Sequence, residues 1–175
     1  LRTGDIYDGL LDLYLVCSSY RAAYRRPALA ASNWLLPPNV FYAEVNHNGQ
    51  TLRGKITLIS LQDFQRGCSR AWFQSYIWGR FSQPTRILYS RDQQTRELIE
   101  NSLLRAARTL LHNSLPVLPP QGTVTGLWEQ ALGLSYSTEL RTERPGRSTE
   151  LVEHSRAFYT TVTKHHAPSL GFGFT

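Results

Sequence analysis

Two charged side chains on separate segments are the best candidates for chemistry in this sequence. Asp12 lies between Leu11 and Val16, where leucines alternate with other residues, so a strand is predicted with the carboxylate on the face opposite the leucines. Lys55 lies in a second predicted strand and is one of two lysines among nineteen basic residues. A carboxylate can bind Mg²⁺ together with substrate phosphates, and an ammonium stabilises negative charge on phosphate oxygens. Together the two residues predict metal-assisted nucleotidyl transfer, whereas each taken singly also fits a solvated surface residue.

The strand that carries Lys55 belongs to a predicted hairpin. Val40 to Asn46 and Thr51 to Ser60 flank Asn48-Gly49, a dipeptide that favours a two-residue hairpin turn. With these two residues at the centre of the turn, Tyr42 lies opposite Lys55 and Glu44 lies opposite Arg53. The polar face then contains Tyr42, Glu44, Arg53, Lys55 and Thr57. The opposite face is predicted to be the apolar core face and contains Phe41, Ala43, Val45, Leu52, Gly54, Ile56 and Leu58.

The rest of the chain is predicted to be mainly helical. Ser60-Leu61-Gln62-Asp63 has the spacing of a capping box, which predicts a helix that reaches about Ile77 and is ended by Gly79. The later predictions are a short strand at Arg86 to Tyr89, helices at Arg91 to Asn113 and Val124 to Leu132, a turn at Gly133 to Ser137, a loop at Thr142 to Arg147, and a last helix that is capped by Ser148 and carries the stripe Leu151 to Val162. Residues 1–88 and 89–175 are the two predicted domains.

An aromatic stretch from Trp72 to Pro84 joins these two parts of the sequence. Its large rings are predicted to pack at a junction, because each can bury a large apolar area. Arg80 and Gln83 within this stretch could instead stand at the mouth of a ligand cleft.

Composition excludes several classes of protein. With 41% hydrophobic and 18% charged residues the chain reads as soluble and globular, and it contains neither a run of about 20 apolar residues nor a recognisable signal peptide. The phosphate-binding loop of NTPases, the serine hydrolase elbow and the zincin motif are absent. The two cysteines and five histidines lack metal-site spacing, so a reducing, intracellular compartment is expected. The net charge of +6 comes mainly from arginine, which fits either a phosphate-bearing partner or a compositional bias.

Four ordered blocks resemble a known family. They are Leu11-Asp12-Leu13, the hairpin from Val40-Phe41-Tyr42 through Asn48-Gly49 to Lys55–Ser60, the segment Tyr76-Ile77-Trp78-Gly79-Arg80-Phe81-Ser82-Gln83-Pro84, and Gly133-Leu134-Ser135-Tyr136-Ser137 with Arg141. The family is the peripheral, mitochondrial-type phosphatidate cytidylyltransferases, the CDP-diacylglycerol synthases also known as mitochondrial translocator assembly and maintenance proteins.

The resemblance implies an α+β fold, in which a polymerase-β-type nucleotidyltransferase domain with a mixed sheet precedes a helical, winged-helix-like domain. It implies formation of CDP-diacylglycerol and pyrophosphate from CTP and phosphatidic acid, with Mg²⁺. Asp12 would be a catalytic metal ligand and Lys55 a catalytic contact of the triphosphate. The implied substrate-binding residues are Tyr42, Tyr76, Arg80, Ser135, Tyr136 and Arg141.

The sequence departs from the family pattern near Asp12. Tyr14 stands where a second carboxylate is expected, so Glu44 and Asp8 become candidates for the second metal ligand. The Gly-Ser element that normally precedes the metal-binding strand of this fold does not occur in these 175 residues. A nucleotidyltransferase with another acceptor and a catalytically inactive nucleotide- or lipid-binding homologue are therefore the alternative readings.

The expected location is the cytoplasm of a bacterium, peripheral on an anionic membrane, or the mitochondrial inner membrane in a eukaryote. Leu151 to Val162 could be the membrane-binding helix, although a helix packed on the core is the simpler reading. Net charge alone gives only weak support to nucleic-acid binding, so no specific nucleic-acid partner is expected.

Overall fold

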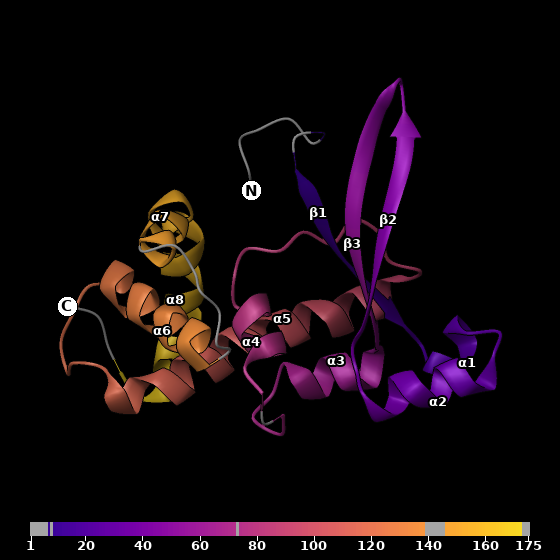
Figure 1. The fold of residues 1–175 in the computed structure, drawn as a ribbon. Helices are drawn as coiled ribbons and strands as arrows, with labels where there is room; N and C mark the ends of the chain where they lie inside the picture. Colours follow the sequence, from indigo (N-terminus) through magenta and orange to yellow (C-terminus); the bar gives the residue numbers. More distant parts are fainter. Residues whose placement is uncertain (1–6, 8, 73, 139–145, 173–175) are drawn as a thin grey trace. The chain divides into compact units, whose positions relative to one another are not determined.

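The chain folds into two compact units, Leu1–Gln65 and Arg66–Thr175, which are described separately below (Figure 1). The computed structural model describes residue 7 and residues 9–72, 74–138 and 146–172. The first unit contains the strands and the first helices, and the second unit is helical. The predicted domain boundary between residues 88 and 89 stays a prediction.

A three-stranded mixed sheet forms the centre of the first unit. The strands are β1 (Leu10–Cys17), β2 (Asn39–His47) and β3 (Gln50–Ser60), in the order β1-β3-β2. β1 is parallel to β3, whereas β2 is antiparallel to it and forms the hairpin visible in Figure 1. This sheet, followed by helices, confirms the predicted α+β class and is consistent with a nucleotidyltransferase-like part and a helical part.

The hairpin has the predicted register. Asn48 and Gly49 have positive φ values of 52° and 76°, as a two-residue turn of this type requires. Tyr42 pairs with Lys55 and Glu44 pairs with Arg53, so the side chains of each pair share a face. The turn chemistry was therefore sufficient to place every residue of the hairpin.

On the predicted apolar core face only Gly54 and Leu58, both on β3, are buried. Leu58 is buried on that face, but Phe41 and Val45 are exposed. On the opposite face, Thr57 and Ile59 are fully buried. Burial therefore follows position along β3 more than it follows the face, because the end of β3 near Ser60 is covered on both sides.

Two short helices lie between β1 and β2 and are attached to the end of the sheet. They are α1 (Tyr20–Ala23) and α2 (Pro27–Leu35). The hydroxyl of Tyr20 donates a hydrogen bond to Asp63 Oδ2 at 2.7 Å, and the Ser60 hydroxyl donates to the same oxygen at 2.9 Å. The amide of Asp63 donates to Ser60 Oγ at 3.1 Å, which confirms the predicted capping box. This carboxylate thus joins the start of α1 to the end of β3.

The helix that follows β3 is much shorter than predicted. α3 (Leu61–Gly67) ends ten residues before Ile77, and Gly79 lies inside the next helix, α4 (Tyr76–Phe81), instead of ending a helix. Gly67 explains the break. A Cβ at this position would lie 2.9 Å from each of three carbon atoms of Ile77, so α4 packs against the end of α3 at a point where only glycine fits.

Part of the aromatic stretch packs as predicted. Trp78 is buried on α4, and the guanidinium of Arg66 lies 5.6 Å from the centre of the Trp72 ring, within the range of a cation–π contact. Phe73 lies outside the described residues.

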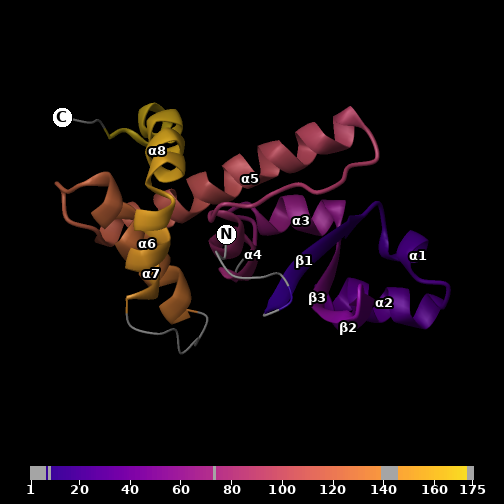
Figure 2. The ribbon, with the colours of Figure 1, turned by 90° about the horizontal axis from the view of Figure 1, so that it is seen from above.

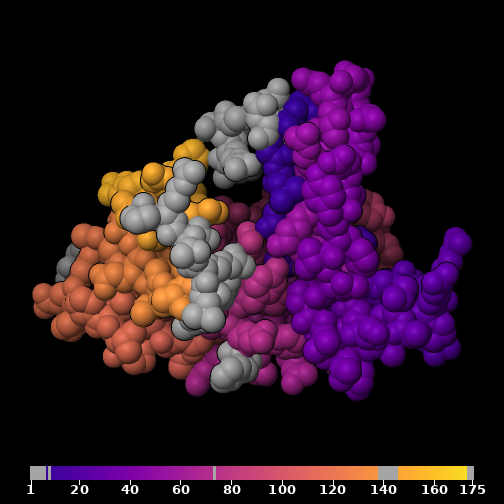
Figure 3. Space-filling view, viewed as in Figure 1, coloured from indigo at the N-terminus to yellow at the C-terminus, as the bar shows by residue number. Residues whose placement is uncertain are grey.

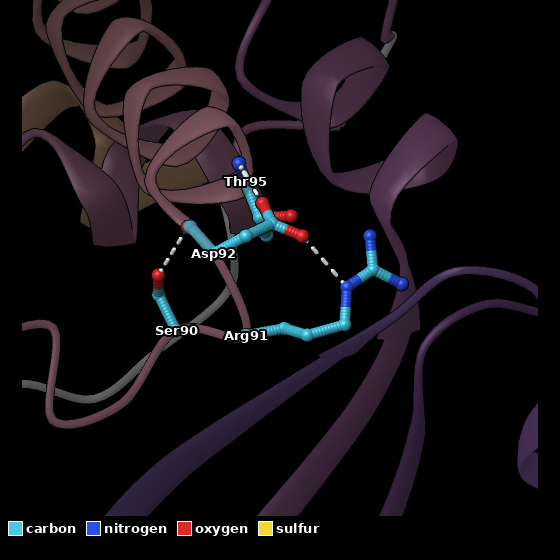
Figure 4. Close-up of polar contacts among 4 residues, drawn as sticks. All are labelled: Ser90, Arg91, Asp92 and Thr95. Carbon is cyan, nitrogen blue, oxygen red and sulfur yellow. Dashed lines mark hydrogen bonds and ion pairs between the residues drawn. The ribbon is translucent and has the colours of Figure 1, made fainter.

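The second unit is built around one long helix, α5 (Gln93–Ser114), which a short 3₁₀ turn (Leu115–Val117) follows. Asp92 caps the helix: its carboxylate accepts from the Thr95 amide at 2.7 Å and from Arg91 Nε at 2.8 Å, and the Ser90 hydroxyl donates to its carbonyl at 2.7 Å (Figure 4). Hydrogen bonds from the side chain and the amide of Thr95, followed by the one from Arg91, lower the pKa of Asp92 to about 2. Residues 86–89 form no strand, contrary to prediction.

Three further helices complete this unit: α6 (Val124–Thr138), α7 (Arg147–His154) and α8 (Arg156–Leu170) (Figure 2). α6 and α8 pack against α5, and α7 packs against α6 and α8. α6 continues through Gly133 to Ser137, where a turn was predicted, because a glycine costs a helix only about 1 kcal/mol. The predicted last helix is divided at Ser155, and Ser148 lies inside α7 after the cap residue Gly146. The predicted loop at Thr142 to Arg147 falls mostly outside the described residues.

The core of the second unit forms around Trp128. Its indole Nε1 donates to Thr163 Oγ1 at 2.7 Å, and its ring centre lies 4.6 Å from that of Tyr159. Burial raises the pKa of Tyr159. Val152, Tyr159 and Val162 are all buried, so the apolar stripe of the predicted last helix packs inside this unit.

Candidate functional site

Asp12, Lys55 and Tyr42 occupy one row across the sheet. Asp12 on β1 pairs with Lys55 on β3, and Lys55 pairs with Tyr42 on β2. Paired residues on neighbouring strands point to the same face, so an acid, a cation and a phenol stand side by side there. The three residues come from distant parts of the sequence, and the strand order β1-β3-β2 places Lys55 in the middle.

The neighbouring row holds Tyr42 in position. Glu44 Oε1 accepts a hydrogen bond from the Tyr42 hydroxyl at 2.5 Å and lies 3.6 Å from Arg53 Nε. The hydrogen bond to Glu44 raises the pKa of Tyr42. The phenol therefore remains protonated at neutral pH, and Arg53 adds a second cation on the face that carries Lys55.

Lys55 is half-buried, and no ion pair joins it to a carboxylate within the described ranges. Its ammonium is therefore available to an added anion. An ion pair between Lys55 and a carboxylate of its own row would compete with such binding, but among the described residues the ion pair on this face joins Arg53 to Glu44. The face thus has a cation whose partner can come from outside the protein.

Thr57 lies on the same face of the sheet and is not among the predicted site residues. It follows Lys55 by two residues on β3, pairs with Tyr14, and is completely buried. Among the described residues its hydroxyl has no hydrogen-bond partner. The period-two pattern of the strand predicts that Thr57 lies on this face. The sequence of the hairpin does not predict that Thr57 is buried, so it gave no reason to include this residue in the site.

The carboxylates on this face are far apart. Asp12 and Glu44 lie on the two outer strands and differ by one row, so strand spacing puts their backbones about 12 Å apart. Mg²⁺ binds oxygen ligands at about 2.1 Å, which requires two of its ligands to approach within about 4 Å. The described residues contain no group of three or more potential metal ligands, and Asp8 lies outside them. Glu44 is engaged with Arg53 and Tyr42. The exposed carboxylate of Asp12 would bind a Mg²⁺ ion whose remaining ligands are water and phosphate oxygens.

A family model described as mitochondrial phosphatidate cytidylyltransferase matches residues 28–160. This range covers most of the chain. The protein belongs to the mitochondrial phosphatidate cytidylyltransferase family. A search of curated proteins found no match. The family assignment from the sequence motifs is therefore confirmed, and the chain is a member of an enzyme family whose activity implies CTP and phosphatidate as substrates.

The phosphatidate cytidylyltransferase match includes Lys55 and Tyr42 but begins after Asp12. The assignment of Asp12 thus depends on its place beside Lys55 in the sheet. The family is described as mitochondrial, so the expectation of a bacterial, cytoplasmic protein has no support. None of the helices in the described ranges is both long and apolar enough to cross a membrane.

The remaining predicted site residues of this cytidylyltransferase lie in the second unit. Tyr76 and Arg80 are on α4, while Ser135 and Tyr136 are on α6, and the two helices are in contact. The Ser75 hydroxyl lies 3.5 Å from the carbonyl of Ser135, which links the two motifs. Ser135 is buried and its hydroxyl donates to the Leu132 carbonyl at 2.9 Å, so its place within the helix packing is fixed. Arg141 lies outside the described residues, and the substrate contacts of this group stay predictions.

Proposed function

We propose that the protein transfers the cytidylyl group of CTP to phosphatidate at a membrane surface, with Mg²⁺, and releases pyrophosphate. The observation that carries the proposal is the row of Asp12, Lys55 and Tyr42 in a chain of the phosphatidate cytidylyltransferase family. The row places a carboxylate, a cation and a phenol on one face. A carboxylate that holds Mg²⁺ and a neighbouring cation can together stabilise the charge of a triphosphate.

The transfer breaks one phosphorus–oxygen bond and forms another. A phosphate oxygen of phosphatidate attacks the α-phosphorus of CTP, and the bond from that phosphorus to the oxygen bridging it to the β-phosphorus breaks. The bonding electrons leave with pyrophosphate. Because the second pKa of a phosphate monoester is about 6, the attacking oxygen is already ionised at neutral pH. The protein therefore has to position the two phosphates and offset their mutual repulsion.

In this proposal Lys55 binds the phosphate oxygens of CTP and stabilises the charge that grows on the leaving pyrophosphate. The hydroxyl of Tyr42 donates its one proton to Glu44, so Tyr42 would donate to the phosphate oxygens only by exchanging Glu44 for them. Asp12 would hold Mg²⁺, which when bound polarises phosphate oxygens and neutralises part of their charge. Arg53 adds positive charge to the face without entering the row.

The second unit is proposed to supply further substrate contacts. Arg80 would bind a phosphate group, because a guanidinium can make two parallel hydrogen bonds with phosphate oxygens. Tyr76, Tyr136 and Arg141 would bind substrate as well, and Ser135 would act through the packing of α6 on α4. The family match covers all of these residues.

The test is an acceptor screen with purified protein, CTP and Mg²⁺, in which both pyrophosphate and the lipid product are measured. Phosphatidate should support stoichiometric formation of pyrophosphate and CDP-diacylglycerol, and EDTA should stop both. Asp12→Asn should remove Mg²⁺-dependent turnover while leaving the thermal unfolding curve unchanged. Turnover with a different phosphate acceptor alone would reassign the substrate. CTP binding without turnover on any acceptor would overturn the proposal in favour of an inactive homologue.

A further inference from the structure

The end of α2 exposes three large apolar side chains in succession. Trp34 and Leu35 are each 70% exposed and Leu36 is 77% exposed. Single exposed apolar residues are common on soluble proteins, whereas contiguous ones mark surfaces that bind a partner or a membrane. The three adjacent exposed residues therefore indicate a surface that binds a partner or a membrane rather than an ordinary solvated helix end.

The solvent face of α2 also lacks charge. Ala30 and Asn33 are its buried residues, and at 100° per residue the opposite side of the helix contains Ala28, Ala31 and Leu35. No charged residue occurs from Pro27 to Ala43. A helix that packs one side on a protein and faces water with the other normally carries charged residues on the second side.

The exposed run is held in place by its neighbours. The hydroxyl of Tyr24 donates to Asn33 Oδ1 at 2.8 Å, and Asn39 Nδ2 donates to the same hydroxyl at 3.0 Å. Both ends of the segment that contains Trp34 to Leu36 are thus bonded to one phenol. Little conformational freedom is lost when a segment fixed in this way meets a partner.

The sequence segment that contains α1 and α2 carries charge of one sign, although the Asp63 carboxylate lies beside Tyr20 at the start of α1. From Leu13 to Ala43 the only charged residues are Arg21, Arg25 and Arg26, and all three are exposed. None of them forms an ion pair in the part of the chain that the structure describes. Arg25 and Arg26 precede the first turn of α2, about 13 Å from its apolar end by the rise of a helix. Basic residues beside exposed Trp and Leu characterise segments that lie on anionic bilayers.

We propose that this α1–α2 surface, made of Arg21, Arg25, Arg26, Trp34, Leu35 and Leu36, docks the protein on an anionic lipid bilayer. The apolar residues enter the interface while the arginines contact lipid phosphates. In Figure 3 the atoms of α1 and α2, indigo to violet, form a projecting part of the surface of their unit. The inference rests on the proposed function, because a phosphatidate-using enzyme must meet its acceptor in a membrane. It differs from the sequence-based candidate, Leu151 to Val162, whose stripe is largely buried.

Vesicle flotation with the full chain tests the proposal. The probes are phosphatidylcholine vesicles alone, with about one third phosphatidylglycerol, and with about one third phosphatidate. The wild type should bind both anionic vesicles and not the neutral ones.

Arg21→Gln/Arg25→Gln/Arg26→Gln should weaken binding about a hundredfold at low salt, since each arginine near the surface contributes about fivefold. Trp34→Ser/Leu35→Ser/Leu36→Ser should weaken vesicle binding by about tenfold or more. Leu88→Ser is the control, because Leu88 is 72% exposed elsewhere, and it should bind as the wild type does.

Tryptophan quenching gives a second readout that does not depend on the amount bound. Brominated anionic lipid should quench the fluorescence of the wild type, and Trp34→Phe should remove most of that quenching. Of the other three tryptophans, Trp78 and Trp128 are buried, and Trp72 is half-buried and belongs to the second unit. Unchanged vesicle binding by both triple variants, or quenching that persists in Trp34→Phe, would overturn the proposal. So would self-association of the wild type that only the apolar triple variant abolishes.

Failure of this inference and failure of the proposed function are distinguishable. Turnover of a short-chain, water-soluble phosphatidate should be unchanged in both triple variants, because it needs no bilayer. If the wild type binds anionic vesicles through this surface but turns over no phosphatidate, the docking inference stands and the proposed function fails. If turnover of vesicle phosphatidate is unchanged in the variants, the docking inference fails alone.

Discussion

Gly67→Ala should destabilise the protein although alanine is the better helix former. The added Cβ would lie 2.9 Å from Cβ, Cγ1 and Cγ2 of Ile77, whereas carbon atoms pack best at about 3.5–4.0 Å. Ile77 is completely buried, so the end of α3 and α4 must move apart to admit the methyl group. Overpacking of this kind costs about 1–3 kcal/mol, and the gain in helix propensity at the last residue of α3 offsets less than about 1 kcal/mol of it.

The measurement is thermal unfolding followed by circular dichroism, with an expected fall in Tm of about 2–6 °C. Gly133→Ala in α6 is the matched control, because nothing lies within 4 Å of a Cβ there, and it should leave Tm unchanged or raise it. In an Ile77→Ala background two of the three contacting atoms are gone, so Gly67→Ala should cost less than in the wild type. Equal or higher stability of Gly67→Ala in the wild-type background would refute the explanation for the end of α3.

Three further substitutions test other parts of the structure. Asp92→Asn should reduce the loss of Tm that the wild type shows as the pH falls. The pKa of Asp92 in the folded protein, about 2, lies below its usual value, so the ionised carboxylate stabilises the fold above about pH 4 and this contribution is lost toward pH 2. Tm measured as a function of pH would show the difference. Tyr20→Phe should lower stability at pH 7 by about 1 kcal/mol through the lost bond to Asp63. It should also reduce the alkaline loss of stability between about pH 10 and 12, since burial and the hydrogen bond raise the pKa of Tyr20 to about 12. Arg80→Gln should lower kcat/KM about tenfold or more at unchanged Tm if Arg80 binds phosphate, and wild-type kinetics would remove it from the site.

The parts of the fold that the sequence predicted well are those governed by local chemistry. Asn48-Gly49 fixed the hairpin register residue by residue, because few sequences adopt two successive positive φ values. Ser60 and Asp63 marked the start of α3 for a similar reason, since a cap is complete within four residues. The row of Asp12, Lys55 and Tyr42 needed one more fact, the parallel pairing of β1 with β3, which the strand patterns alone do not determine.

The predictions that were wrong concern where helices end. The glycine pattern predicts helix ends at Gly79 and Gly133, but both residues lie inside helices because tertiary packing outweighs a cost of about 1 kcal/mol. The true break after Gly67 arises from the approach of Ile77, a residue ten positions away, and no local pattern reveals it. The break at Ser155 likewise has no local signal as strong as glycine or proline.

Lys55 is proposed to contact the triphosphate of CTP. The most direct test of this contact is kcat/KM for CTP in Lys55→Met. Lys164→Met is the control, because Lys164 is the only other lysine and is exposed on α8. Loss of a charge-assisted contact worth about 1.5–3 kcal/mol should lower kcat/KM about 10- to 150-fold in Lys55→Met, with wild-type kinetics in Lys164→Met. Equal kcat/KM for Lys55→Met and the wild type, at equal stability, would contradict the claim.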